Sequence, residues 1–291
     1  MQRSQRRAQA MLLLFVLALW GCGGQSVDVG VGLSNGSNGQ LAGPTGAIGQ
    51  ELATYEILDI ASGTTVTASS VPDLLSNHAY YTTAIVFRRV HGLQNDFFLG
   101  VFDITQGQWK KLASGGTPWT AIPVSVVPAP AAGVDADSLP AYNVSFDLIS
   151  STLSVYNLTA KPQLSVPNVK QWQFSCAAGT DPNFWSWGTS RDPAVSILFA
   201  NVQRTQMPTL GSSAALGGPT PVGSFLPNAF GFYDMHGNVW EWVTPGPHIC
   251  GGSWADGIDQ ARTSNVAGSD TCQVTDQTSH ALIGMRLVLS P

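Results

Sequence analysis

Short alternating runs of apolar and polar residues dominate the first part of the chain and predict β-strands separated by turns. The stretch 55–60 nearly alternates and is followed by the turn dipeptide Ser62-Gly63. Residues 80–90 and 97–102 are rich in β-branched and aromatic side chains. We therefore expect the folded part of the chain to open with strands.

Helices are predicted at two places. Thr105 can cap a short helix in which Trp109 and Leu112 lie on one face. Residues 142–147 lead into a second predicted helix, which ends at about Tyr156. Strands and helices are thus both expected, in separate parts of one chain.

The stretch 227–242 combines aromatic, acidic and turn-forming residues more densely than the rest of the sequence. The pair Gly237-Asn238 suits positive backbone φ angles, and the residues after it favour a buried strand. Asp234 and Glu241 lie among the aromatics, where an unpaired carboxylate is costly, so the pattern predicts a cation beside them. The alternative is a core hairpin whose acids reach solvent.

Composition adds a loop-rich character. Apolar residues make up 44% of the 291-residue chain and include nine tryptophans, enough for a sizeable core. Only 11% of the residues are charged, and there are 31 glycines and 18 prolines. No basic patch is present, which argues against nucleic acid as a partner.

The first residues have the pattern of an export signal. Three arginines precede the apolar run 11–20, which is too short for a stable membrane span. Residues 19–22, Leu-Trp-Gly-Cys, resemble a bacterial lipobox, so we expect residues 1–21 to be removed and Cys22 to be lipidated. An ordinary secretory signal is the alternative. Residues 22–50 read as a flexible Gly/Ser/Asn tether and residues 51–291 as the folded domain.

Several motifs, in order along the chain, resemble the formylglycine-generating (sulfatase-modifying factor) family. Residues 104–109, ITQGQW, are similar to the family's VTQGQW, and residues 227–242 to its GNVWEW segment. Residues 250–254, CGGSW, match RGGSW with Cys250 in place of arginine, and residues 283–288, IGMRLV, match IGFRLV. The resemblance implies an α+β fold, a loop-rich single domain of the formylglycine-generating-enzyme variant of the C-type lectin fold.

The family's oxidation of a substrate cysteine depends on copper held by two thiolates shortly after the Gly-Gly-Ser. Soft thiolates suit copper(I). The corresponding positions in this chain are Asp256 and Ala261, neither of which is a thiol. We therefore expect no copper and no formylglycine formation. Ser253, Trp254, Asp256 and Arg262 are the residues we expect on a ligand-binding face.

The resemblance also implies a structural calcium ion. Carried over position by position, its ligands would be the carboxylates of Asp234 and Glu241 and the backbone carbonyls of Gly237 and Val239. Hard oxygen donors of this kind suit Ca²⁺ better than a transition metal.

The cysteines predict one covalent link. Because an exported chain meets an oxidising compartment, we expect Cys250 and Cys272 to form a disulfide that closes the loop between them. The resemblance implies a helix around Trp172, and Cys176 falls in it and reads as a small buried hydrophobe.

Three functions remain open from the sequence. The first is a lipid-anchored, catalytically silent domain that binds a ligand or protein partner at the surface of a bacterial cell, with a secreted protein as the alternative location. The second is an enzyme of the same superfamily with chemistry that the residues do not identify. The third is a retroelement-diversified C-type-lectin-like binding protein, in which side chains around 250–280 would vary between copies.

Overall fold

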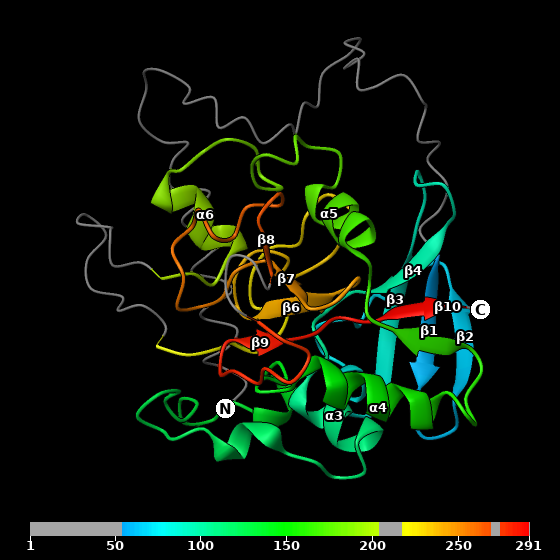
Figure 1. Ribbon diagram of the computed structural model, residues 1–291. Helices are drawn as coiled ribbons and strands as arrows, with labels where there is room; N and C mark the ends of the chain where they lie inside the picture. The colour runs from blue at the N-terminus through cyan, green and yellow to red at the C-terminus, as the bar shows by residue number, and fades with distance from the viewer. Residues whose placement is uncertain (1–53, 204–216, 269–273, 291) are drawn as a thin grey trace. The chain divides into compact units, whose positions relative to one another are not determined.

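A computed structural model describes residues 54–203, 217–268 and 274–290 (Figure 1). The leader, the tether, Cys22 and Cys272 lie outside these ranges, so the predictions made for them stay predictions. Among the described residues, no helix has the length and apolar character needed to cross a membrane.

The larger sheet has six strands in the order β2-β1-β3-β4-β10-β5, and every neighbouring pair is antiparallel. The strands are β1 (Tyr55–Asp59), β2 (Thr64–Ala68), β3 (Ala84–Val90), β4 (Phe97–Gly100), β5 (Gln163–Ser165) and β10 (Val288–Ser290). The last strand of the chain is therefore inserted between β4 and β5, as Figure 1 shows. This insertion ties the carboxyl end of the protein to its first strands.

The smaller sheet has four strands in the order β8-β7-β6-β9. They are β6 (Trp240–Val243), β7 (His248–Cys250), β8 (Val266–Gly268) and β9 (Ile283–Gly284). The pair β6 and β9 is parallel, and the other two pairs are antiparallel. The predicted strand after the Gly237-Asn238 turn is thus β6, which lies between β7 and β9 in this sheet.

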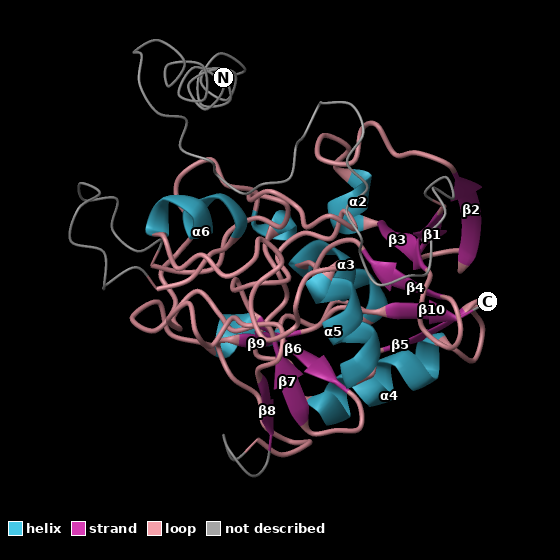
Figure 2. Cartoon of the chain, turned by 90° about the horizontal axis from the view of Figure 1, so that it is seen from above, coloured by secondary structure: helices cyan, strands magenta, loops and turns pink. Residues whose placement is uncertain are grey.

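The predicted helices form and are capped as their sequences suggest. The main helices are α3 (Gln106–Leu112), α4 (Phe146–Tyr156) and α5 (Val169–Ala177); α2 (Ala79–Thr82), α6 (Pro193–Phe199), η1 (Pro118–Ala121) and η2 (Ala136–Ser138) are short. Capping boxes begin α3 and α5, and the Ser145 hydroxyl caps α4. Figure 2 shows α3, α4 and α5 grouped beside the strands, with much of the chain in loops. The expected loop-rich α+β fold is confirmed.

One local prediction is wrong at its start. Residues 80–82 belong to the helical turn α2, and the strand begins only at Ala84. The reason is a long-range contact, because the Gln108 side chain in α3 donates to the carbonyls of Tyr80 and Ala84. Residues 80–82 therefore form a helical turn, in spite of their β-propensity, which places two carbonyls within reach of the buried Gln108 amide.

Most of the tryptophans are core residues. Trp109, Trp172, Trp185 and Trp242 are among the largest fully buried side chains of the described part. Trp240 is also buried. The expectation that the tryptophans build a sizeable core is met by these five side chains.

Candidate functional site

The turn before β6 holds the chain in left-handed backbone conformations. Gly237 and Asn238 have φ angles of 83° and 64°, as the sequence predicted, and Asp234 has a φ of 59°, which it did not. A β-carbon at Gly237 would lie 2.1 Å from the carbonyl oxygen of Asn201. The close approach of two backbones therefore requires glycine at this position, and it fixes the start of β6.

Arg286 is the cation that the buried acids of this turn require. Its Nε and Nη2 donate to the two carboxylate oxygens of Glu241, each at 3.0 Å. Nη2 also lies 3.3 Å from Oδ1 of Asp103, and the same guanidinium donates to the carbonyls of Gly100 and Tyr233. Arg286, Glu241 and Asp103 are all fully buried. The predicted cation is thus an arginine from near the end of the chain.

The buried cluster nevertheless contains more acids than bases. One oxygen of Asp103 and one of Asp234 have no hydrogen-bond partner among the described residues. Burial raises the pKa of Asp103 well above its ordinary value, and the neighbouring Glu241 charge adds to this effect. Burial likewise raises the pKa of Asp234 to about 6, although the backbone N–H of Gly223 opposes the shift.

The expected calcium ligands fit this arrangement poorly. Asp234 offers one unpartnered oxygen, Oδ1. Both oxygens of Glu241 already accept from Arg286, and the indole N–H of Trp172 also donates to Oε2 at 2.7 Å. A calcium ion bound to Glu241 would therefore lie beside the positive charge of the guanidinium, which opposes its binding. The calcium site stays a prediction of the resemblance, and this geometry does not support it.

At the first position corresponding to a copper thiolate, the structure places a fixed carboxylate. Oδ2 of Asp256 accepts from the backbone N–H of Ser253 at 3.0 Å, from the Ser253 hydroxyl, and from the indole N–H of Trp240 at 2.8 Å. Ser253 is fully buried, whereas Asp256 is partly exposed. Oδ1 of Asp256 has no hydrogen bond to any residue that the structure describes. One oxygen is therefore anchored and the other is free.

The second such position is closed. Ala261 is fully buried, and a β-carbon at Gly252 would lie 3.0 Å from its Cα. Within the described ranges, no group of three or more His, Cys, Asp or Glu side chains is arranged to hold a metal ion.

The remaining residues of the predicted ligand face have separate surroundings. The backbone N–H of Trp254 donates to the carbonyl of Asn238, and its buried indole N–H has no partner among the described residues. Arg262 is paired with Asp259 at 2.7 Å, and its guanidinium lies 5.3 Å from the ring centre of Trp185. Asp256 is thus a partly exposed residue of this face whose Oδ1 has no hydrogen-bond partner among the described residues.

His236 is a buried residue whose role the sequence did not reveal. Its Nε2 accepts from the backbone N–H of Ser186 at 3.0 Å, so Nδ1 carries the proton and donates to the carbonyl of Ala261 at 2.7 Å. Burial lowers its pKa to about 4. His236 is therefore a neutral bridge between two loops. The sequence offered one signal for it, a histidine between Met235 and the Gly237-Asn238 turn.

Both described cysteines are free and buried. Cys176 lies in α5, as predicted, with its Sγ 3.3 Å from the Thr263 hydroxyl and 3.6 Å from the carbonyl of Met235. Burial raises the pKa of both thiols, so each is protonated at neutral pH. The pairing of Cys250 with Cys272 stays a prediction, because Cys272 lies outside the described residues.

Comparison with known proteins is consistent with this geometry. Residues 88–291 match the family described as "Sulfatase-modifying factor enzyme 1-like domain". The formylglycine-generating enzyme of Mycobacterium tuberculosis is 38% identical over 81 residues, covering 27% of this chain and 26% of that protein. The bovine (Bos taurus) protein "Inactive C-alpha-formylglycine-generating enzyme 2" is 30% identical over 127 residues, covering 38% of this chain and 40% of that protein. The match thus spans well under half the length of either relative.

A solved structure shares the fold. "Treponema denticola variable protein 1" superposes with a TM-score of 0.55 at 16% identity, covering 72% of this chain and 96% of that one. The match of the family to residues 88–291, together with the buried Arg286–Glu241 pair and the Gly237 turn that its last motifs build, shows that this chain belongs to the sulfatase-modifying factor enzyme 1-like family.

Proposed function

We propose that this chain is a catalytically silent member of its family that binds a ligand at the cell surface. The observation that carries the proposal is the pair of positions where relatives hold copper. Asp256 presents a carboxylate there, and Ala261 presents a buried methyl group. Copper(I) prefers two soft, polarisable ligands, and this pair supplies none.

The two described thiols do not replace the missing ligands. Cys176 and Cys250 are both fully buried and protonated, so neither offers a thiolate to a metal at the surface. The bovine relative described as inactive supports the proposal, because it shows that the family includes members without the oxidase activity.

The test for the absence of catalysis uses the purified full-length protein, copper(I) and a peptide that carries the sulfatase cysteine motif. Mass spectrometry then measures conversion of the peptide cysteine to the aldehyde, with the Mycobacterium tuberculosis enzyme as the positive control. We expect no conversion by this protein under conditions in which the control reaches completion. Conversion that is lost in Cys250→Ser would overturn the proposal, because it would show that a buried thiol becomes a copper ligand.

The binding face is centred on Asp256. Its anchored oxygen fixes the carboxylate, and the free Oδ1 is suited to a ligand that donates hydrogen bonds or carries positive charge. The Trp240 indole N–H is a reporter, since it donates to the anchored oxygen of the same carboxylate.

The binding test is a titration of ¹⁵N-labelled protein with methylguanidinium and, separately, with tetramethylammonium as a cation without donors. We expect the Trp240 indole signal to shift with methylguanidinium and not in Asp256→Asn, which keeps the acceptor for Ser253 and Trp240. Asp259→Asn is the matched control, because Asp259 is an exposed acid already paired with Arg191 and Arg262. Equal shifts in all three proteins would contradict a site at Asp256.

Anchoring of the chain by lipid at Cys22 is part of the same proposal. It rests on the sequence of residues 11–22. Cells that express the full chain and are fed labelled palmitate should label the wild type and not Cys22→Ser. A soluble, unlabelled wild-type protein in the medium would favour the secreted alternative.

A further inference from the structure

Helix α5 lies over one face of the smaller sheet. Glu241 in β6 and Cys250 in β7 are directly opposite each other in an antiparallel pair, so their side chains project from the same face. The indole N–H of Trp172 in α5 donates to the Glu241 carboxylate at 2.7 Å. The inner side of α5 therefore packs on the face from which Cys250 projects.

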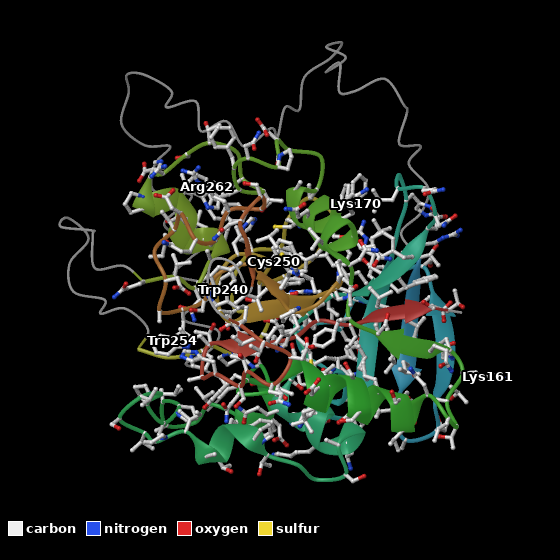
Figure 3. All side chains as sticks on the ribbon, viewed as in Figure 1. Lys161, Lys170, Trp240, Cys250, Trp254 and Arg262 are labelled. Atoms are coloured by element: carbon white, nitrogen blue, oxygen red, sulfur yellow. The ribbon has the colours of Figure 1, made fainter. Side chains whose placement is uncertain are left out.

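Cys176 follows Trp172 by one helical turn and lies on the same side of α5. Cys176, Cys250, Trp172 and Met235 belong to one buried apolar cluster. The carbonyl oxygen of Met235 is 3.6 Å from Sγ of Cys176 and would be 3.5 Å from a β-carbon on Gly251, the residue after Cys250. Figure 3 marks Cys250 on β7 in the interior of this half of the molecule. The two thiols thus share one interface between helix and sheet.

Cys176 is also close enough to affect the ionisation of Cys250. Burial is the main cause of the raised pKa of Cys250, and the nearby Cys176 adds to it. Cys250 is fully buried within the cluster. The Cys250 side chain therefore faces the apolar cluster that also contains Cys176.

We propose that Cys176 and Cys250 form a disulfide that joins α5 to β7 when the chain folds in an oxidising compartment. Two thiols lose two protons and two electrons, and one S–S bond forms. The electrons pass to a disulfide oxidant, of a protein or of glutathione, whose own S–S bond is cleaved to two thiols. Because both sulfurs are buried in the folded state, the exchange occurs during folding, before α5 closes over β7.

The positions of the lysines and arginines allow the disulfide pairing to be determined by tryptic digestion. Trypsin cleavage after Lys170, Arg191, Arg204 and Arg262 places the cysteines in separate peptides, which are 171–191 for Cys176, 205–262 for Cys250 and 263–286 for Cys272. Cys22 falls in an earlier peptide. Each pairing thus has its own cross-linked mass.

The experiment unfolds the full chain in denaturant with reductant, refolds it in a buffer of reduced and oxidised glutathione, and blocks free thiols before digestion. We expect peptide 171–191 linked to peptide 205–262, and the same link in Cys272→Ser. A link between 205–262 and 263–286, or a protein in which Cys176 and Cys250 are both alkylated, would overturn the proposal.

A second measurement tests for the bond in the wild-type protein, so that the conclusion does not depend on a variant that folds poorly. The urea midpoint of the refolded wild type should fall when the reductant dithiothreitol is added, because a cross-link between distant residues restricts the unfolded chain. The same fall is expected in Cys272→Ser and should be absent in Cys250→Ala. Equal midpoints with and without reductant in the wild type would contradict the bond.

Discussion

Arg286 and Glu241 form a bidentate ion pair with both side chains fully buried and both N···O distances at 3.0 Å. Arg286 lies between β9 and β10, and Glu241 lies in β6. The indole N–H of Trp172 in α5 also donates to the carboxylate. The pair therefore links three parts of the chain at the centre of the fold.

Replacing Arg286 with methionine should be strongly destabilising. The change leaves Glu241 and Asp103 buried without their cation, which costs about 3–5 kcal/mol in the free energy of unfolding. Urea denaturation measures it. Arg191→Met is the control, since Arg191 forms an exposed pair with Asp259 and should change stability by less than about 1 kcal/mol. Similar losses in both variants would show that the buried pair has no special role.

Asp234 should make the protein more stable as the pH falls from neutral. Its folded pKa of about 6 lies above the ordinary value of 3.8, so the folded state binds the proton more tightly. The cost of burying the charge is fully present above pH 6 and disappears as the pH falls from 6 to 3.8, a gain on the order of 3 kcal/mol. Asn tolerates the positive φ at this position, so Asp234→Asn should be folded and lack this pH dependence. The difference between the two unfolding curves across pH 4–8 measures it, and a flat difference would refute the shift.

His236 should act in the opposite direction. Its folded pKa of about 4 lies below the ordinary value of 6.5, so the neutral ring is the form that the fold accepts. Its contribution is complete above pH 6.5 and is lost as the pH falls through 4. His236→Gln should lose about 1–3 kcal/mol at pH 7, because the hydrogen bonds to Ala261 and Ser186 are impaired. The free energy of unfolding of this variant should also no longer fall as the pH is lowered from 6.5 to 4. Urea denaturation at several pH values measures this, and a variant that keeps the fall would show that another group causes it.

Calcium should have little effect on stability. Arg286 and Trp172 occupy the Glu241 carboxylate, so the donor set of the expected site is incomplete. Thermal unfolding in EDTA and in millimolar calcium should give the same midpoint. If calcium raises the midpoint of the wild type but not that of Asp234→Asn, the ion binds at this carboxylate and the family site survives.

The elements with local signals were predictable from the sequence. The Thr105 cap, the end of α4 at Tyr156 and the turn at Gly237-Asn238 depend on residues a few positions apart, and all form where the pattern placed them. The need for a cation near Asp234 and Glu241 was also readable, because burying a carboxylate is costly in any fold. The resemblance placed Asp256 and Ala261 at the positions of the family's two thiolates, and their residue types showed that both thiols are missing.

Only the tertiary structure determined which partners these residues contact. Arg286 lies against Glu241, since β10 is inserted beside β4 and brings the end of the chain to the core. The anchoring of Asp256 by Trp240, and the placing of Cys176 on the face that bears Cys250, depend on the same long-range pairing. The sequence determined which groups need partners, through their propensities and the cost of burying them. The choice among partners required the sheet order, because contacts between distant residues depend on how the whole chain packs rather than on local spacing.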